Sequence, residues 1–462
     1  MAYGAVQVLL AVQPPIPIDL NFDIRVDRSV LLFTAGVSLL AGLLFGLAPA
    51  LQSTNPDVAP TLRDEGGAVV GGGRGWSLRG ALIVAQVALS FVLLVGAGLF
   101  LRSLQKAQRI DPGFDTSPAA VLWTNLEMSG VSPDEGPALL RTMRERLAGI
   151  PGLQAVAVAD RLPMGAEIRI EGVLPEGVEP PAGRDDHDVD VAVVDGAYFR
   201  VMGVPMLRGR AFDAADGPDT RPVVVVSQAF VDRFWPGEAA VGRTITSGNE
   251  TFTVVGVARD TKVRTLGEAP RPYVYFNADQ RYPPAPQFVL RGTLPAARLV
   301  AEGRRALREV RDDIVLLEAK TMDEHLALML FPPRAIAALL GAFGLVALLL
   351  SGVGIYGLVS YSVARRTREV GLRLALGADP GRVVRHVVAG GMRTVVAGAV
   401  LGLAASAAVT GLLARFLYGV NPLDLATFAG IALVLGGVAL GAAYVPALRA
   451  SRVDPVAALR SD

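Results

Sequence analysis

Long apolar segments alternate with polar stretches along the chain. Five of these segments, residues 30–51, 80–101, 336–361, 383–413 and 425–445, are almost free of charged side chains. Each reaches the roughly 20 residues that a helix needs to cross a bilayer. A helix of that length buried in a soluble protein would carry one polar face, and these segments carry none. The pattern therefore predicts five membrane-spanning helices.

A long polar interval separates the second apolar segment from the third. Strand-like runs occur there at residues 189–196, 221–228, 251–260 and 272–276, and helix-like stretches at 134–148, 227–235 and 296–312. The whole interval, residues 102–334, is far too long to be a loop. Strands mixed with helices and punctuated by Gly and Pro are typical of an α+β domain.

Composition agrees with a membrane protein. The chain is 52% hydrophobic and only 19% charged, below the roughly 25% charged residues usual in soluble domains, and its mean hydropathy is +0.43. A formal net charge of +1 argues against nucleic-acid binding, which needs a concentrated basic face. The absence of cysteine from the sequence excludes disulfides, thiolate metal sites and thiol nucleophiles.

Arginines gather in the short polar segments. The stretch 364–386 has six of them, the 52–79 linker and the C-terminal tail three each, and the connection 418–424 none. Since Lys and Arg are retained on the cytoplasmic side, the three basic segments are predicted to be cytoplasmic. Residues 102–334 and 414–424 then lie outside.

The chain contains an internal repeat. Residues 45–63 align without gaps on residues 442–460, with Pro, Asp and Arg at matching positions. The repeat indicates a duplicated protein whose first unit is reduced here to its last helix and tail. The expected organisation is a remnant of the preceding unit (1–64), a Gly-rich cytoplasmic linker (65–79), a transmembrane helix (80–101), an outer domain (102–334) and a membrane domain (335–462) with a cytoplasmic loop at 362–382.

Other patterns favour structural roles. The Gly-rich run 65–75 lacks the G-K-[ST] ending of a phosphate-binding loop, so we expect no nucleotide hydrolysis in this chain. His187 lies among four acidic residues in 184–190; a solvated acidic loop is favoured over a divalent-cation site, because the spacing matches no standard one. His325 and His386 are isolated, no Ser/His/Asp set has an elbow motif, and Gln86 suits close helix packing.

Energy for transport is expected to come from a partner. No Asp, Glu or Lys lies in the core of any predicted span, whereas proton- or ion-coupled transporters usually show such groups. The sequence "TREVGLRLALGA" at 367–378 has apolar residues at helical spacing flanked by Arg368 and Arg373. Such a short basic amphipathic helix either lies in the membrane interface or docks into a groove on a partner protein.

The order of these motifs resembles a known family. A span, then "REVGLRLALGA", two further spans and "PALRASRVDPVAALR" resemble the FtsX-like permease domain of MacB-type ABC transporters. Residues 193–245 are similar to that family's periplasmic core domain, and the resemblance runs from about Gly80 to the end. It implies a membrane α-helical bundle with an inserted α+β periplasmic core domain. The additional leading span, which puts Met1 outside, departs from the four-span unit of the family.

By this resemblance, residues 367–378 form the coupling helix that contacts a separate ATPase. The matching positions are Arg368, Glu369, Val370, Gly371, Leu372, Arg373, Leu374, Leu376, Gly377 and Ala378. The chain would be a permease of the bacterial inner (plasma) membrane, not an enzyme, with no cofactor or metal of its own, since ATP and Mg²⁺ belong to the partner.

The implied function is efflux or export by mechanotransmission, in which ATP-driven movement of the coupling helix changes the shape of the outer domain. Partners would be a cytoplasmic ABC ATPase, membrane lipid, a second permease unit and a periplasmic protein, and not nucleic acid. Two alternatives stay open at this point. One is an FtsX-type regulator of periplasmic cell-wall hydrolases, and the other is a non-functional permease fragment.

Overall fold

The computed structural model describes residues 32, 33, 35, 36, 39, 78–165, 167–365, 379–413 and 417–451. Most of the first predicted span (30–51), all of the linker 65–75 and the first copy of the repeat (45–63) lie outside these residues. The predicted domain boundaries therefore stay predictions.

Four long helices form the membrane part: α4 (Leu78–Ala107), α9 (Met322–Arg365), α11 (Pro380–Leu413) and α12 (Leu425–Ser451). Within the described residues, these four helices are long and apolar enough to cross a membrane. They contain the predicted spans 80–101, 336–361, 383–413 and 425–445. Their exposed leucines and valines would face lipid.

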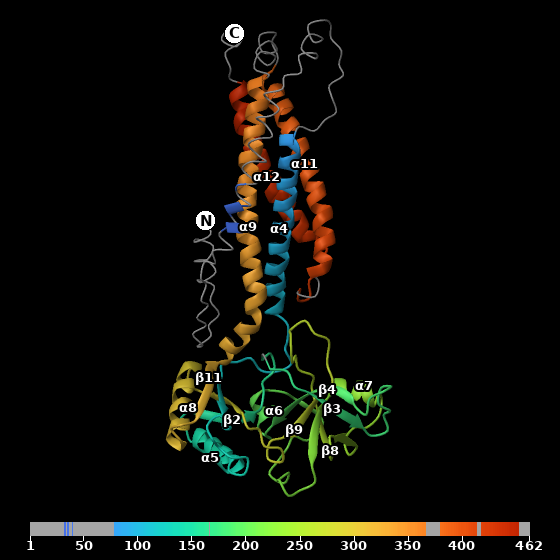
Figure 1. Ribbon diagram of the computed structural model, residues 1–462, viewed down its shortest axis with the longest axis vertical. Coiled ribbons are helices and arrows are strands. Elements are labelled where there is room, and N and C mark those ends of the chain that lie inside the picture. Colours follow the sequence, from blue (N-terminus) through green and yellow to red (C-terminus); the bar gives the residue numbers. More distant parts are fainter. Residues whose placement is uncertain are drawn as a thin grey trace. The chain divides into compact units, whose positions relative to one another are not determined.

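Helix α4 lies among the other three (Figure 1). In its most apolar stretch 44% of the residues are buried, against 17–28% for the other helices. Small residues let α11 approach closely: a Cβ on Gly402 would lie 2.6 Å from the Phe91 Cβ, and one on Gly398 would lie 2.7 Å from the Val87 Cβ. Packing against such small residues replaces the hydrophobic effect as the source of helix association in lipid.

The α+β domain is inserted between α4 and α9 and consists of two lobes. Lobe one comprises β1 (Ala120–Asn125), α5 (Gly136–Ala148), β2 (Leu153–Ala159), β10 (Gln287–Gly292), α8 (Ala296–Val310) and β11 (Val315–Thr321). Its strands are antiparallel in the order β11-β1-β10-β2. This is the ferredoxin-like β-α-β-β-α-β arrangement, with lobe two inserted between its second and third strands.

Lobe two is a closed ring of six strands. It comprises β3 (Ile170–Pro175), β4 (His187–Val194), β6 (Val223–Ser227), β7 (Thr244–Ser247), β8 (Glu250–Ala258) and β9 (Tyr273–Asn277), together with the edge strand β5 (Met206–Gly209) and the helices α6 (Tyr198–Val201) and α7 (Gln228–Phe234). The ring runs β4-β3-β7-β8-β6-β9 and closes where β9 pairs with β4 in parallel. Closure leaves these six strands without free edges.

The core follows from the apolar runs of the strands. In β4, Val191 and Val193 point into the core of lobe two, while Ala192 and Val194 face a second buried cluster shared by both lobes. A strand buried on both faces reads as a continuous apolar run rather than an alternating one. The predicted α+β class is therefore confirmed, although the sequence pattern did not reveal β1, β2, β3, β5, β7, β10 and β11.

Candidate functional site

The predicted coupling segment lies outside the described residues. This holds for Arg368, Glu369, Val370, Gly371, Leu372, Arg373, Leu374, Leu376, Gly377 and Ala378. Its two anchors are described: α9 ends at Arg365 and α11 begins at Pro380. Asp379 precedes α11 and accepts a hydrogen bond from the Gly381 amide at 3.3 Å. The segment therefore joins two of the four long helices directly.

Helix α9 begins without a connecting loop at the end of β11. The Thr321 hydroxyl accepts a hydrogen bond from the Glu324 amide at 3.2 Å, and the Glu324 carboxylate accepts one from the Thr321 amide at 2.8 Å. This reciprocal pair is a capping box, which fixes where a helix starts. With 44 residues at a rise of about 1.5 Å each, α9 is roughly 66 Å long. A single helix therefore connects lobe one to Arg365.

Two prolines interrupt the regular hydrogen bonding of α9. Pro332 and Pro333 lie inside the helix, and each lacks the amide that would bond to the preceding turn. The helix changes direction near its start (Figure 1), as prolines commonly cause. The residues of α9 before the prolines pack on lobe one, and the residues after them pack in the helix bundle.

Helix α4 is attached to lobe two. After its last turn the chain runs along that lobe: the Asp115 amide donates to the Met202 carbonyl at 2.7 Å, and the Lys262 amide donates to the Pro112 carbonyl at 2.7 Å. An ion pair between Asp111 and Arg259, with 2.5 Å between Oδ2 and Nη2, adds a side-chain link. The same segment is also tied to lobe one, because Asp115 pairs with Arg291 of β10, with 2.5 Å between Oδ2 and Nη1, and the chain then continues into β1.

Polar contacts tie α4 to its neighbours. The hydroxyls of Ser90 in α4 and Ser351 in α9 are 3.1 Å apart and buried. At the end where α4 leads into the domain, the Tyr418 amide donates to the Ser103 hydroxyl at 2.7 Å. Arg102 pairs there with Asp424. Hydrogen bonds within a bundle are each worth about 0.6–2 kcal/mol, so these contacts hold the helices in register.

Asp424 has a second role as the N-cap of α12. Its Oδ2 accepts hydrogen bonds from the Thr427 amide at 2.9 Å and from the Thr427 hydroxyl at 2.7 Å. These bonds to Thr427, followed by the nearby Arg102, hold the pKa of the Asp424 carboxyl below its usual value despite partial burial. The sequence placed this aspartate at the start of an apolar span, and capping is the physical reason for its position.

His325 in the first turn of α9 is structural, as expected. Its Nε2 lies 3.0 Å from the Pro163 carbonyl, and burial lowers the pKa of the imidazole. His386 is exposed near the start of α11. Gln86 faces α9, where its Oε1 would lie 3.6 Å from a Cβ on Gly354, which agrees with the predicted packing role.

The acidic loop 184–190 is neutralised by arginines rather than arranged around a cation. Asp188 pairs with Arg184, whose hydrogen bond lowers the pKa of the carboxyl. His187 packs edge-on against Phe234 at 4.9 Å between ring centroids. Among the described residues, no group of three or more His, Cys, Asp or Glu side chains is placed to hold a metal ion.

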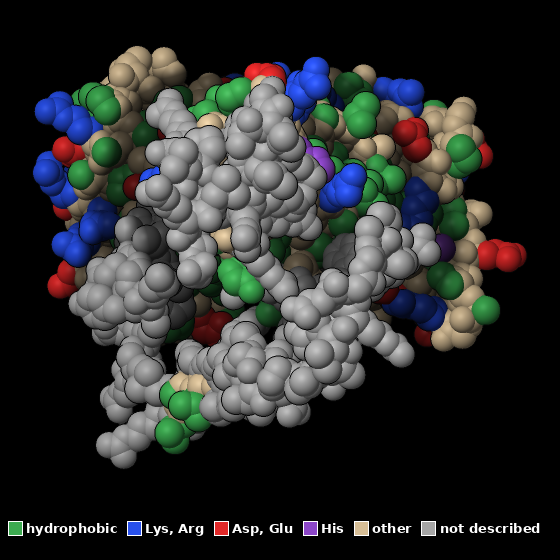
Figure 2. All heavy atoms as spheres, turned by 90° about the horizontal axis from the view of Figure 1, so that it is seen from above, with side chains coloured by type: hydrophobic (Ala, Val, Ile, Leu, Met, Phe, Trp, Pro, Cys, Tyr) green, Lys and Arg blue, Asp and Glu red, His purple; other side chains and the backbone are tan. Residues whose placement is uncertain are grey.

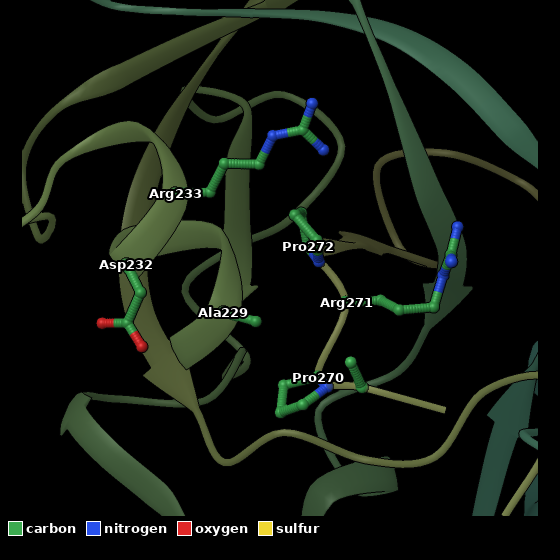
Figure 3. A pocket seen from close by; sticks show the side chains of 7 residues that line it. Ala229, Asp232, Arg233, Pro270, Arg271 and Pro272 are labelled. Atoms are coloured by element: carbon green, nitrogen blue, oxygen red, sulfur yellow. The ribbon is translucent and has the colours of Figure 1, made fainter. Parts of the chain in front are cut away.

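A shallow pocket of about 560 Å³ lies in lobe two, between α7 and residues 269–272. In Figure 3, Pro270 and Pro272 lie across from Ala229 and Asp232 of α7, while Arg271 points away from α7 toward a neighbouring strand. There the Arg271 Nε donates to the buried Asp190 at 2.8 Å.

Basic and acidic side chains are interspersed on the part of the surface that is visible in Figure 2.

Comparison with known proteins assigns a family description to most of the described chain. Residues 81–315 match the family described as "MacB-like periplasmic core domain", and residues 341–455 match "FtsX-like permease C-terminal".

Two relatives are bacterial transport proteins. One, "Macrolide export ATP-binding/permease protein MacB" from Rhodospirillum rubrum, is 29% identical over 343 residues, 70% of this chain and 49% of the relative. The other, "Probable export ATP-binding/permease protein MacB" from Pseudomonas entomophila, is 27% identical over 288 residues, 60% of this chain and 43% of the relative. The chain therefore spans about half the length of the curated relatives it matches.

Among solved structures, the chain is similar to the periplasmic region of MacB from Actinobacillus actinomycetemcomitans. The identity is 14% and the TM-score 0.33, over 47% of this chain and 95% of that one.

Proposed function

The chain belongs to the family of MacB-like ABC transporter permeases with an FtsX-like membrane domain, and from this membership we propose that it couples a cytoplasmic ATPase to its α+β domain. In the proposed mechanism, ATP-driven movement of the ATPase displaces residues 367–378. The displacement passes along α9 and changes the shape of the domain. Efflux or export of a substrate is the result.

The observation that carries the proposal is the continuity of α9. One helix of 44 residues begins at the capping box on β11 and ends two residues before the predicted coupling segment. A helix transmits displacement along its axis without a hinge wherever its hydrogen bonds are unbroken. The prolines at 332 and 333 would turn axial displacement into a change of angle where α9 meets lobe one.

The different attachment of α4 and α9 supports a change of domain shape. Helix α9 starts directly on β11 of lobe one, whereas the segment after α4 contacts both lobes. A shift of α9 past α4 would therefore act first on β11 and lobe one. Because the two lobes share one buried cluster, such a movement would reach lobe two through packed side chains.

ATP and Mg²⁺ would belong to the partner ATPase, and the α+β domain would face the periplasm of a bacterial inner (plasma) membrane. The arginines of 364–386 support this orientation through the retention of positive charge in the cytoplasm. Macrolides are what the Rhodospirillum rubrum relative is named for exporting; an apolar or amphipathic cargo reaching the domain from outside the membrane would suit the same mechanism here. A second permease unit would be needed to face a dimeric ATPase.

Co-purification from membranes tests the proposal. The full chain is captured together with candidate ABC ATPase subunits, in the wild type and in Arg368→Glu/Arg373→Glu. The matched control is Arg382→Glu/Arg385→Glu, which makes the same charge change on exposed positions of α11. We expect the wild type and the control to retain an ATPase and the coupling-segment variant to lose it.

Two outcomes would count against the proposal. Retention of the ATPase by Arg368→Glu/Arg373→Glu would remove the contact assigned to residues 367–378. Capture of a cell-wall hydrolase in place of any ATPase would favour the FtsX-type regulatory function.

A further inference from the structure

One turn of lobe two contacts the helix bundle. This turn, residues 262–268, lies between β8 and β9. Its Gly267 lies against Tyr418, since a Cβ on Gly267 would be 3.1 Å from the Tyr418 Cδ1 and 3.8 Å from the Tyr418 Cα. Tyr418 belongs to the connection between α11 and α12. The contact therefore joins lobe two to the end of the bundle where α4 leads into the domain.

Hydrogen bonds within the turn fix its shape. The Glu268 Oε1 accepts from the amides of Val263 at 2.5 Å and Arg264 at 3.1 Å. The Lys262 ammonium donates to the Glu268 carbonyl. Leu266 packs against the buried cluster that both lobes share. Bonds from a charged carboxylate to backbone amides are stronger than neutral ones, so the turn moves as one piece with the core beneath it.

Further bonds attach the turn to lobe two. The Arg264 Nη2 donates to the Asp190 Oδ1 of β4 at 2.5 Å. The Val263 carbonyl accepts from the Met164 amide at 2.7 Å. Met164 lies in the segment that leads from β2 to β3. A displacement applied to the turn would therefore reach both β4 and the segment by which the chain enters lobe two.

Tyr418 is held equally firmly on the side of the bundle. Its amide donates to the hydroxyl of Ser103 in α4 at 2.7 Å, and the Lys106 ammonium donates to the carbonyl of the next residue at 2.6 Å. Its neighbours Leu417 and Val420 pack in the buried cluster of the bundle. The half-buried ring of Tyr418 is thus fixed to the helices and rests on the turn.

Helix α11 connects this contact to the predicted coupling segment. It begins at Pro380, two residues after that segment, and ends at Leu413, five residues before Tyr418. With 34 residues at a rise of about 1.5 Å each, it is roughly 51 Å long. The coupling segment is therefore continued by a long helix on each side, α9 toward lobe one and α11 toward lobe two.

We propose that the contact of Tyr418 with the turn 262–268 is a second route by which displacement of residues 367–378 reaches the α+β domain. The inference rests on the proposed function and adds to it. Helix α9 acts on lobe one at β11, and α11 acts on lobe two through Tyr418. Tyr418 is a positioning residue, and its ring carbons make the contact. Unequal movement of the two helices then changes the shape of the domain.

Cross-linking of the full chain in membranes tests the contact itself. The sequence has no cysteine, and the 3.8 Å between a Cβ on Gly267 and the Tyr418 Cα suits a disulfide. We expect Gly267→Cys/Tyr418→Cys to form this disulfide after mild oxidation, detected as linked peptides by mass spectrometry. The control pair is Gly217→Cys/Tyr418→Cys, because a Cβ on Gly217 of lobe two meets nothing within 4 Å, and it should stay unlinked.

Distances between spin labels test whether the contact transmits movement. Ala239→Cys in lobe two and Ala301→Cys in lobe one, both exposed, carry the labels in the full chain purified with its ATPase. We expect Tyr418→Ala to lose most of the difference between the distance distributions in Mg²⁺ and ATP and in ADP, while the ATPase is retained as in the wild type.

Two matched variants separate this effect from a general loss of aromatic packing. Tyr418→Phe keeps the ring and should keep the nucleotide-dependent difference. Tyr444→Ala makes the same truncation at an exposed position of α12 and should also keep it.

The outcomes distinguish this inference from the proposed function. A wild type with the same distribution in ATP and in ADP would contradict both. A nucleotide-dependent change that is undiminished in Tyr418→Ala would overturn the second route alone. So would failure of the Gly267→Cys/Tyr418→Cys pair to cross-link, which serves as the test if Tyr418→Ala does not fold.

Discussion

Asp190 in β4 is a buried carboxylate that forms ion pairs with two arginines of lobe two. Its Oδ1 accepts from Arg264 at 2.5 Å and its Oδ2 from Arg271 at 2.8 Å, and only 3% of its side chain is exposed. Asp190→Ala would leave both guanidiniums without this partner. We expect a loss of about 2–3 kcal/mol in the free energy of unfolding.

Urea unfolding followed by tryptophan fluorescence measures that loss, because Trp235 is buried in the same core. Asp188→Ala, at an exposed position paired with Arg184, is the matched control and should change little. Equal effects of the two substitutions would show that burial of Asp190 does not determine its contribution to the free energy of unfolding.

The stability of the domain should respond to acid through Asp195. Its pKa of about 6 in the folded state exceeds the ordinary value of 3.8. Between these two pH values the folded chain binds a proton that the unfolded chain does not. Stability from this group therefore rises as pH falls from about 6 toward 4, by on the order of 3 kcal/mol.

Urea unfolding at several pH values checks this sign. The difference in unfolding free energy between wild type and Asp195→Asn should grow in favour of the wild type on acidification. A pH-independent difference would contradict the assigned pKa.

The capping box at the start of α9 can be tested in the same way. Thr321→Ala removes the hydroxyl that accepts from the Glu324 amide, and we expect a loss of about 1 kcal/mol in unfolding free energy. Thr142→Ala is the control, because the exposed Thr142 hydroxyl donates to the Ala138 carbonyl in the preceding turn of α5. If both variants unfold like the wild type, the cap does not fix the start of α9.

At the scale of elements, close packing of α11 on α4 is the feature most sensitive to a small change. Gly402→Ala would place a Cβ 2.6 Å from the Phe91 Cβ, whereas Gly411→Ala in the same helix meets nothing within 4 Å. Both changes raise helix propensity by about 1 kcal/mol.

We therefore expect Gly411→Ala to leave the melting temperature unchanged or higher, and Gly402→Ala to lower it. Thermal unfolding in detergent, followed by loss of helical circular dichroism, is the measurement. A Gly402→Ala protein as stable as Gly411→Ala would mean that α4 and α11 are not in the contact described.

The sequence predicted elements where the apolar pattern was strong. The four spans 80–101, 336–361, 383–413 and 425–445 are helices, and the predicted strand-like runs form β4, β6, β8 and β9. Among the missed strands of lobe one, β11 was missed for a physical reason. Six of its seven residues are only partly buried, so neither alternation nor a continuous apolar run marks it.

At the scale of the whole molecule, the sequence did not predict which distant segments contact each other. Lobe one depends on β1 pairing with β10, as in Ala120 with Leu290, across the complete insertion of lobe two. The Arg144–Asp195 contact likewise joins residues whose nearness no local pattern reveals. The coupling residues at 368–378 rest on resemblance and stay a prediction.

The continuity of α9 from β11 to Arg365 supports the central claim of the account, that ATP at a partner subunit changes the shape of the α+β domain. Spin labels at Ala239→Cys and Ala301→Cys report this directly when the chain is purified with its ATPase and held at constant pH. The account predicts that Mg²⁺ and ATP change the interlobe distance distribution relative to ADP, and that Arg368→Glu/Arg373→Glu abolishes the change. An ATPase that hydrolyses ATP in the complex while the distribution stays the same would contradict it.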